Sequence, residues 1–374
     1  MQRVLLGFET EFSLIKEAIR NEFLPTLFSI NLSEQEKDLL CRPTRFAGLG
    51  IFDPVQTARW QYENSRAATD SISIALKSGN NLDLDSYHAN SRDVMKNKNV
   101  QEKQLKTDTQ NLMNQFSVHQ KRVISCKLDF KCSGWLSVFP TAATHFEWSP
   151  DEFRDSLAMR YGKTPTRLQS TCDADGEVFD VNHALNCPRG GLVYGRHNEM
   201  RDLNCNLLEL AGLKQVTREP IVRNSNMNGE NGLRADWGAR GFWDAQQMAL
   251  FDVCIFNPES SSMVNLTLET LFHQKAKEKS TTYSNAAEQR RASFNPFIAT
   301  CDAVLDSNAE SYIKSLAIHL SQKWNSSLSQ VIGWLRARIQ ICILRSVSLC
   351  LRGSRTRWRG AGIEDSAALP NISD

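Results

Sequence analysis

The segment ALFDVCIF (249–256) constrains the fold more than any other stretch of this 374-residue chain. Both alternating sets of positions are apolar, so the segment predicts a strand that is buried on both faces. Asp252 is its only charged residue. Such a strand needs neighbouring strands and covering helices, which predicts an α/β (α+β) fold with a mixed sheet flanked by helices.

Apolar spacing along the rest of the chain agrees with this fold class. A capping box of Ser149 and Glu152, with Pro150 between them, predicts a helix start. The expected helices lie at 150–161, 196–211 and about 266–291, with two more up to 352, and the expected strands at 215–222, 233–238 and 297–302.

Changes in composition divide the chain into five predicted segments. They are a helical segment (1–78), a polar linker with helices (79–148), a helix followed by a loop rich in metal-binding residue types (149–195), the α/β domain (196–352), and a basic and then flexible tail (353–374).

Composition excludes several classes of protein. With 41% hydrophobic residues, 23% charged residues and a net charge of +2, the chain belongs among ordinary globular proteins. Its ten cysteines lack the spacing of a secreted disulfide framework and no signal peptide is recognisable, so we expect a reducing compartment and no secretion. The apolar run at 331–353 contains Arg336, Arg338 and Arg345, which predicts a buried amphipathic helix and no membrane partner.

A second aspartate stands in an apolar setting on the preceding expected strand. Asp236 and Asp252 belong to strands close enough in sequence to be hairpin neighbours, so we expect their carboxylates to converge on one edge of the sheet. On the helix that follows, Lys279 falls within the apolar stripe. Metal-dependent phosphodiester cleavage uses these groups: carboxylates hold Mg²⁺, and a lysine orients the attacking water. Glu199 is a candidate fourth member.

The same residues also have a purely structural interpretation. In it, the two aspartates form ion pairs with nearby cations, namely Arg234, Arg240 or Lys279. Spacing alone gives the two interpretations about equal weight.

The segment CDADGEVFDVNHALNC (172–187) has the spacing of a Cys-x2-Cys-x7-His-x3-Cys zinc knuckle, with Asp175 in the place of the second cysteine. His183 and Cys187 would share one face of a helical turn, and Cys172 would lie on the preceding loop. Because a carboxylate is a harder ligand than a thiolate, we expect a weakened zinc site. Alternatively, His183 and Cys187 pack under the loop without metal. His197 is expected to form a hydrogen bond near a helix start and not to replace a ligand.

A basic stretch, RGSRTRWR (352–359), follows the last expected helix. Arginines with an aromatic residue are typical of phosphate contact with base stacking, although most charge runs are only solvated surface. The candidate nucleic-acid-binding residues are Lys275, Arg352, Arg355, Arg357, Trp358 and Arg359.

Several of these segments together resemble one family. RHNEMRDLNCNLLELA (196–211), LRADWGARGFW (233–243), ALFDVCIF, KAKEKSTTYSNAAEQRRASFNPF (275–297) and LRGSRTRW (351–358) resemble the C-terminal part of the polyproteins of site-specific non-LTR retrotransposons. Those polyproteins end in a zinc knuckle and a restriction-like endonuclease of the PD-(D/E)xK class. The resemblance runs from about Trp135 to Leu351. More weakly, residues 1–78 resemble the region after a reverse-transcriptase palm.

The resemblance implies roles for individual residues. Asp236 matches the first active-site aspartate of the family, Asp252 the second, Lys279 the lysine on the helix and Tyr283 the tyrosine that follows it. The chain departs from the family at two positions, with Ala235 in place of the usual proline and Thr282 where a second lysine is common. It contains no polymerase motif of paired aspartates after Tyr or Phe.

The function implied is a retroelement-derived restriction-like endonuclease that nicks DNA by Mg²⁺-dependent phosphodiester hydrolysis and lacks the reverse-transcriptase core. DNA is the expected partner, with the element's RNA as a second candidate, and the expected location is the nucleus if the protein is functional and the cytoplasm otherwise. Two other interpretations stay open: a DNA-binding remnant that has lost cleavage, and an α/β protein with no nucleic-acid role.

Overall fold

The computed structural model describes residues 2–129, 131–225 and 232–356. The chain divides into two compact units: unit 1 comprises Met1–Thr166 and Asp302–Ile341, and unit 2 comprises Arg167–Cys301 and Cys342–Asp374. This division differs from the predicted segments. Residues 302–341, which we assigned to the domain of the sheet, group with the N-terminal helices, and the loop at 172–187 groups with the sheet.

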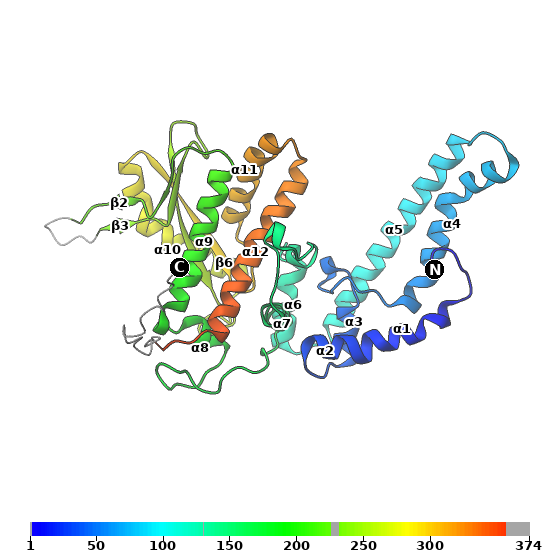
Figure 1. Cartoon of the computed structure of the whole chain (residues 1–374), viewed down its shortest axis with the longest axis horizontal. Helices are drawn as coiled ribbons and strands as arrows, with labels where there is room; N and C mark the ends of the chain where they lie inside the picture. The colour runs from blue at the N-terminus through cyan, green and yellow to red at the C-terminus, as the bar shows by residue number, and fades with distance from the viewer. Residues whose placement is uncertain (1, 130, 226–231, 357–374) are drawn as a thin grey trace, which may run out of the picture. The chain divides into compact units, whose positions relative to one another are not determined.

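Unit 1 is built from helices (Figure 1). The predicted capping box is confirmed, because Ser149 N donates to Glu152 Oε2 (2.8 Å) and Glu152 N donates to Ser149 Oγ (3.2 Å). The segment predicted as a polar linker with helices (79–148) is largely helical. The elements of this unit are η1 (Glu9–Phe12), α1 (Ser13–Glu17), η2 (Ala18–Phe23), α2 (Leu24–Phe28), α3 (Glu34–Leu40), η3 (Thr44–Phe46), α4 (Pro54–Ser78), α5 (Leu84–Met113), α6 (Val118–Asp129), η4 (Gly134–Leu136), η5 (Ala142–Thr144), α7 (Pro150–Arg160), α11 (Ser307–Trp324) and the first part of α12 (Leu328–Arg352).

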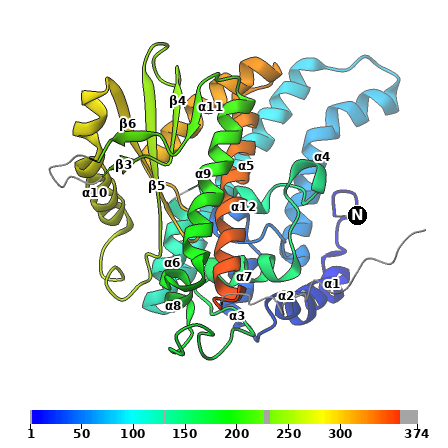
Figure 2. The same cartoon turned by 60° about the vertical axis from the view of Figure 1, so that its left-hand side comes forward.

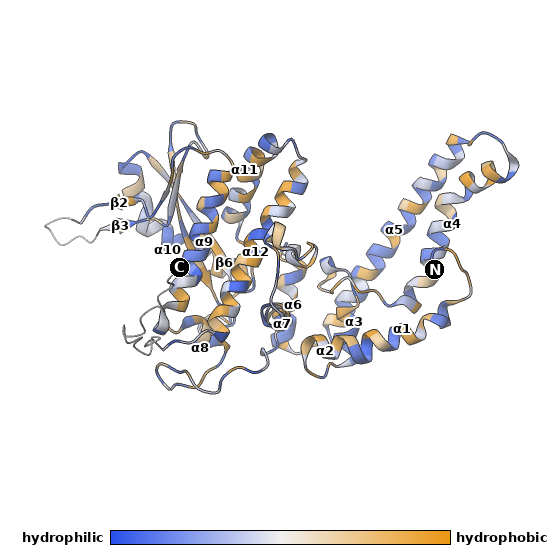
Figure 3. Cartoon of the chain, viewed as in Figure 1, coloured by the Kyte–Doolittle hydropathy of each residue, from blue (hydrophilic) through white to orange (hydrophobic). Residues whose placement is uncertain are grey.

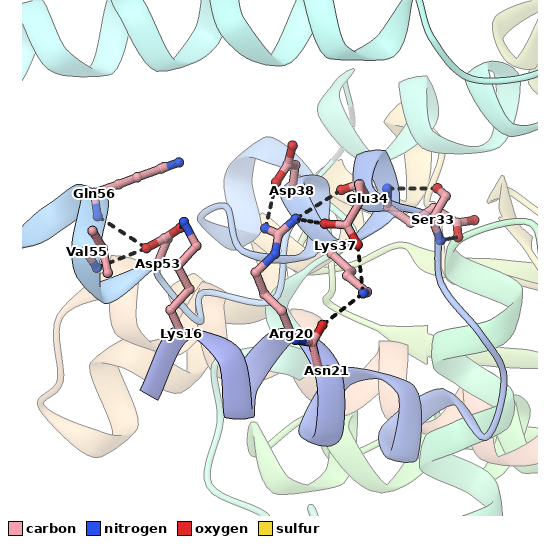
Figure 4. A network of polar contacts seen from close by, with 11 residues as sticks. Lys16, Arg20, Asn21, Ser33, Glu34, Lys37, Asp38, Asp53, Val55 and Gln56 are labelled. Carbon is pink, nitrogen blue, oxygen red and sulfur yellow. Dashed lines mark hydrogen bonds and ion pairs between the residues drawn. The ribbon is translucent and has the colours of Figure 1, made fainter. Parts of the chain in front are cut away.

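A polar network joins the first helices of unit 1 (Figure 4). Arg20 donates to Asp38 Oδ1 (2.7 Å) and Glu34 Oε2 (2.6 Å), and Lys37 donates to Glu34 Oε1 (2.8 Å). The pKa of Glu34 is lowered to about 2, chiefly by the hydrogen bond from Lys37 and next by the one from Arg20. Because Glu34 is exposed, such pairs contribute only about 0–1 kcal/mol each and act mainly to orient the helices.

The late apolar run forms α12, as predicted. Within unit 1 its fully buried Gln340 accepts a hydrogen bond from Trp135 N (3.2 Å) and donates one to Lys131 O (2.8 Å). A buried amide satisfied on both sides in this way fixes the loop at 131–135 against the helix. In the described part of the chain, no helix has the length and apolarity that crossing a membrane would need.

Unit 2 contains a four-stranded mixed sheet in the order β1-β4-β5-β6, which confirms the predicted fold class (Figure 2). β1, β4 and β5 pair antiparallel, while β5 and β6 pair parallel. A second, two-stranded antiparallel sheet pairs β2 with β3. The strands are β1 (Val216–Arg218), β2 (Ile221–Arg223), β3 (Leu233–Arg234), β4 (Trp237–Arg240), β5 (Met248–Phe256) and β6 (Ala292–Thr300).

Helices cover this sheet. α10 (Leu268–Gln289) connects β5 to β6, the crossover that a parallel pair requires. It packs on Leu250 and Ala292 through Tyr283, Ala286 and Ala287. α9 (Leu192–Leu210) contacts β1, β4 and β5. The unit also holds α8 (Val181–Asn186) and η6 (Arg189–Gly191). Figure 3 shows the helices with apolar and polar stripes, as expected for helices that cover a core on one side.

Two predicted strands are each divided in the structure. The run at 233–238 becomes β3 and β4, with Asp236 at the break, and the run at 215–222 becomes β1 and β2. The strand predicted at 297–302 is longer, because β6 starts at Ala292 and includes Pro296. Proline usually argues against a strand, but β6 lies at the edge of the sheet, where proline is tolerated.

Candidate functional site

β5 carries the buried aspartate of the site. The strand is confirmed, and Asp252 in its centre is 3% exposed. Lys279 on α10 forms an ion pair with Asp252 through Nζ and Oδ2. The lysine side chain is 27% exposed, so it links a buried carboxylate to the surface. Both the catalytic and the structural interpretation predict this ion pair, so it does not distinguish between them.

Asp236 lies at the break between β3 and β4. Its Oδ2 accepts the backbone N–H of Val253 (2.6 Å) and lies 3.0 Å from His197 Nε2. Its own backbone N–H donates to Phe251 O (2.9 Å). Since Trp237 pairs with Phe251, Asp236 adjoins the part of β5 that carries Asp252. The two aspartates are therefore neighbours, with Asp252 on β5 and Asp236 directly before the adjacent strand β4.

The charges of this cluster depend on one another. Burial raises the pKa of Asp252, the charge of Asp236 raises it further, and Lys279 opposes both effects. Burial alone would lower the pKa of Lys279, but the charge of Asp252 and the hydrogen bond to it raise the pKa overall. Burial also acts to lower the pKa of His197, and the hydrogen bond with Asp236 together with the charges of both aspartates outweighs it. Both cations are therefore stabilised in their charged forms by the carboxylates.

The donor set of Asp236 and Asp252 fits a hard divalent cation. Mg²⁺ prefers oxygen ligands and is commonly held by one or two carboxylates together with substrate phosphates. Lys279 adds a cation beside them that could contact a phosphate. Tyr283, one turn further along α10, donates its hydroxyl to Arg234 O (3.0 Å), and burial raises its pKa above the ordinary value. This tyrosine is therefore a hydrogen-bond donor here and not an anion.

α9 brings His197 to the aspartates, and Glu199 is exposed. The role that we predicted for Glu199 does not fit this arrangement. Glu199 lies two residues after His197, so its side chain is turned by about 200° around the helix and points away from the aspartates. α9 starts at Leu192, so His197 lies in its second turn and not at its start. The spacing of Met200, Asn204 and Leu207, which are all buried, could have shown that His197 faces the sheet, because His197 continues the same helical stripe. The apolar pattern did not show this stripe, because Asn204 is polar.

Lys275 lies on α10 one turn before Lys279. Its Nζ pairs with the exposed carboxylate of Glu278 (3.1 Å). An exposed pair of this kind is weak and exchanges readily, so contact between Lys275 and a phosphate stays a prediction.

Arg355, predicted to contact nucleic acid, is instead buried at 2% exposure. Its guanidinium donates to Ala184 O (2.9 Å), Cys350 O (2.5 Å) and Gly353 O (3.1 Å) and lies over the Phe179 ring (4.8 Å). A guanidinium used in this way cannot reach a phosphate, so this part of the prediction is wrong. The sequence gives no sign of it, because the partners are backbone carbonyls.

Of the other candidate residues in the basic stretch, only Arg352 lies in the described part of the chain. Arg352 is the last residue of α12 and is partly exposed. Arg357, Trp358 and Arg359 lie outside the described residues.

The zinc-knuckle-like loop brings its four predicted ligands together. The ligand atoms of Cys172, Asp175, His183 and Cys187 all lie within 4.8 Å of one another. A turn closed by Gly176 N donating to Cys172 O (3.0 Å) places Asp175 beside Cys172. α8 supplies the other pair, with His183 inside it and Cys187 at its C-terminal end.

This donor set fits a tetrahedral zinc ion. Asp175 lies 3.6 Å from Cys187 Sγ through Oδ2 and 3.6 Å from His183 Nε2 through Oδ1. Zinc bond lengths of about 2.0–2.3 Å separate neighbouring ligand atoms by about 3.3–3.8 Å. The two 3.6 Å contacts lie in this range but use different oxygens of Asp175, and the whole set lies within 4.8 Å, so a bound zinc ion would draw the ligands closer together. Burial raises the pKa of the Cys187 thiol, and Asp175 and Cys172 raise it further. Zinc would have to displace that proton, which makes binding dependent on pH.

Replacing Asp175 with cysteine should tighten zinc binding. A thiolate suits zinc better than a carboxylate and would complete the four-ligand pattern, so we expect affinity to rise by about tenfold or more, equivalent to at least about 1.4 kcal/mol. Competition with a chromogenic chelator measures this change. The control is Ala174→Cys, which adds a thiol at the exposed position next to Asp175 and is not expected to raise affinity to the same extent. Equal affinity of Asp175→Cys and the parent protein would argue against Asp175 as a ligand.

A comparison with models of protein families finds no match to this chain, and a comparison with curated proteins finds none either.

Proposed function

We propose that unit 2 is a metal-dependent endonuclease that nicks DNA by phosphodiester hydrolysis. One observation carries the proposal. A buried aspartate on a central strand pairs with a lysine from the crossover helix, and a second aspartate adjoins it just before the neighbouring strand β4. Burial of two carboxylates at adjacent positions costs free energy that a purely structural role does not require, whereas a cation site uses both charges.

Each residue has a defined part in this reaction. Asp236 and Asp252 would hold Mg²⁺, and the bound ion would polarise the phosphate and lower the pKa of water. Lys279 keeps Asp252 in position and, being partly exposed, can donate a hydrogen bond to a phosphate oxygen or to the attacking water. Tyr283 fixes the backbone next to Asp236 through Arg234 O.

The test is nicking of supercoiled plasmid DNA by the full chain. We expect conversion to the open-circular form with Mg²⁺ and none with EDTA. DNA binding without nicking would favour the catalytically inactive remnant, and neither binding nor nicking would exclude both. The control is Lys277→Met, which removes a lysine from the exposed side of α10 and should leave nicking unchanged.

The pH dependence of nicking should follow Asp252. Because burial and the charge of Asp236 raise the pKa of this carboxyl, protonation at falling pH removes a metal ligand earlier than for an ordinary aspartate. We expect the Mg²⁺ concentration for half-maximal nicking to rise as pH falls towards the usual aspartate range near 4. An Mg²⁺ requirement that is constant across this range would argue against Asp252 as a ligand.

We also propose that the chain derives from the C-terminal part of a non-LTR retrotransposon polyprotein. The Cys-Asp-His-Cys cluster supports this proposal, because it lies in the same unit as the two aspartates, as in the family that the sequence resembles. DNA, and the element's RNA as a second candidate, are then the partners, zinc is the ion of the cluster, and the nucleus is the place of action.

A further inference from the structure

One oxygen of Asp236 receives two hydrogen-bond donors from two different elements. The backbone N–H of Val253 on β5 donates to Oδ2 over 2.6 Å, and His197 Nε2 on α9 lies 3.0 Å from the same atom. Both of these donors therefore meet Oδ2. The two oxygens of this carboxylate are therefore not equivalent.

We propose that His197 is a positioning residue of the endonuclease site, which holds Asp236 so that Oδ1 is the oxygen available to the divalent cation. This inference rests on the proposed function. A ligating carboxylate whose second oxygen accepts hydrogen bonds is held in one orientation, and loss of such supporting bonds typically weakens metal affinity by about 10–100-fold. His197 itself touches neither the cation nor the DNA in this proposal.

The surroundings of His197 hold its ring in place. The Tyr194 ring, three residues earlier on α9, stacks on it with centroids 6.3 Å apart and an interplanar angle of 6°. The neighbouring Arg196 is buried and ties α9 to β5, because its Nη2 donates to Ile255 O (3.3 Å). The other ring nitrogen, Nδ1, is buried and makes no hydrogen bond with any described residue. The imidazole ring therefore uses Nε2 to contact Asp236, and its position is fixed by the packing around it.

An ion pair between His197 and Asp236 that only stabilised the fold would show the same contact. The test therefore measures a quantity that does not depend on the stability of the fold. Cation affinity is such a quantity. Mn²⁺ reports it directly, because free and protein-bound Mn²⁺ differ in their electron paramagnetic resonance spectra. The Mg²⁺ concentration for half-maximal nicking gives a second, independent value.

The experiment compares His197→Ala and His197→Gln with the parent chain. Alanine removes the donor, so we expect the Mn²⁺ dissociation constant and the half-maximal Mg²⁺ concentration both to rise about 10–100-fold. Glutamine can place an N–H near the position of Nε2, so it should recover most of this loss. The control is His273→Ala, an exposed histidine on α10, which should match the parent in both values.

Three other outcomes would contradict either the proposed function or the role of His197. If the parent binds no Mn²⁺ and does not nick DNA, the proposed function and this inference both fail. If the parent is active and His197→Ala binds Mn²⁺ equally well, only this inference fails. If alanine and glutamine weaken binding equally and lower the unfolding temperature equally, His197 is a stabilising residue and not a positioning one.

Discussion

Replacing Asp252 with asparagine should abolish nicking while the fold and DNA binding are retained. Asparagine keeps the shape of the side chain but removes the negative charge that would hold Mg²⁺, so we expect a loss of at least about 100-fold in rate, or about 2.7 kcal/mol. Lys279 would lose its partner, but it is 27% exposed and can turn to solvent. We therefore expect a stability change of either sign of only about 1 kcal/mol.

The structural interpretation makes the opposite prediction for the same variant. If the ion pair of Asp252 and Lys279 only stabilises the fold, breaking it should cost about 3–5 kcal/mol, and there is no cleavage to lose. Nicking and thermal unfolding measured on the same samples separate the two interpretations. Asp244→Asn is the matched control, because Asp244 is an exposed aspartate between β4 and β5. An unfolded Asp252 variant beside an inactive parent would rule out the nuclease.

Replacing Arg355 with alanine should destabilise unit 2 strongly. The change removes hydrogen bonds to the carbonyl oxygens of Ala184, Cys350 and Gly353, of which the first two belong to buried residues. Hydrogen bonds to charged groups contribute about 1.5–3 kcal/mol each, and they are not additive, so we expect a loss of at least about 3 kcal/mol. Urea unfolding followed by circular dichroism measures it.

A matched control for Arg355 is the exposed Arg189 of η6, whose replacement by alanine should change stability by no more than about 0.5 kcal/mol. If Arg355→Ala unfolds at the same urea concentration as the parent, Arg355 is not the anchor of unit 2.

The strands and helices of unit 2 could be predicted from the sequence where one pattern dominates. β5 is apolar on both faces and α10 carries an apolar stripe, so their positions and the neighbourhood of Asp252 and Lys279 follow from periodicity. The break at Asp236 could not be predicted, because residues 233–240 have the pattern of one short strand, and only their pairing in two different sheets divides them into β3 and β4.

The errors at individual residues have a common physical cause. Glu199, His197 and Arg355 were assigned from residue type and from approximate element boundaries, but their roles depend on which side chains and carbonyl groups face them. Those partners come from elements far away in sequence: His197 meets Asp236, and Arg355 meets the carbonyl of Ala184. Such long-range contacts leave no local periodic signal. The four cysteine, aspartate and histidine positions at 172–187 came together because their spacing is itself local.

The arginine anchor of unit 2 has a consequence for the order of events during translation. Residues 342–356 pack with residues made more than a hundred positions earlier, since Arg355 bonds to Ala184 and to the carboxylate of Asp173 through its backbone N–H (2.9 Å). A ribosome adding about 5–20 residues per second therefore exposes the sheet and the loop at 172–187 for several seconds or more before residues 342–356 emerge. Nascent chains of this protein are therefore expected to bind folding helpers until residues 342–356 have left the exit tunnel.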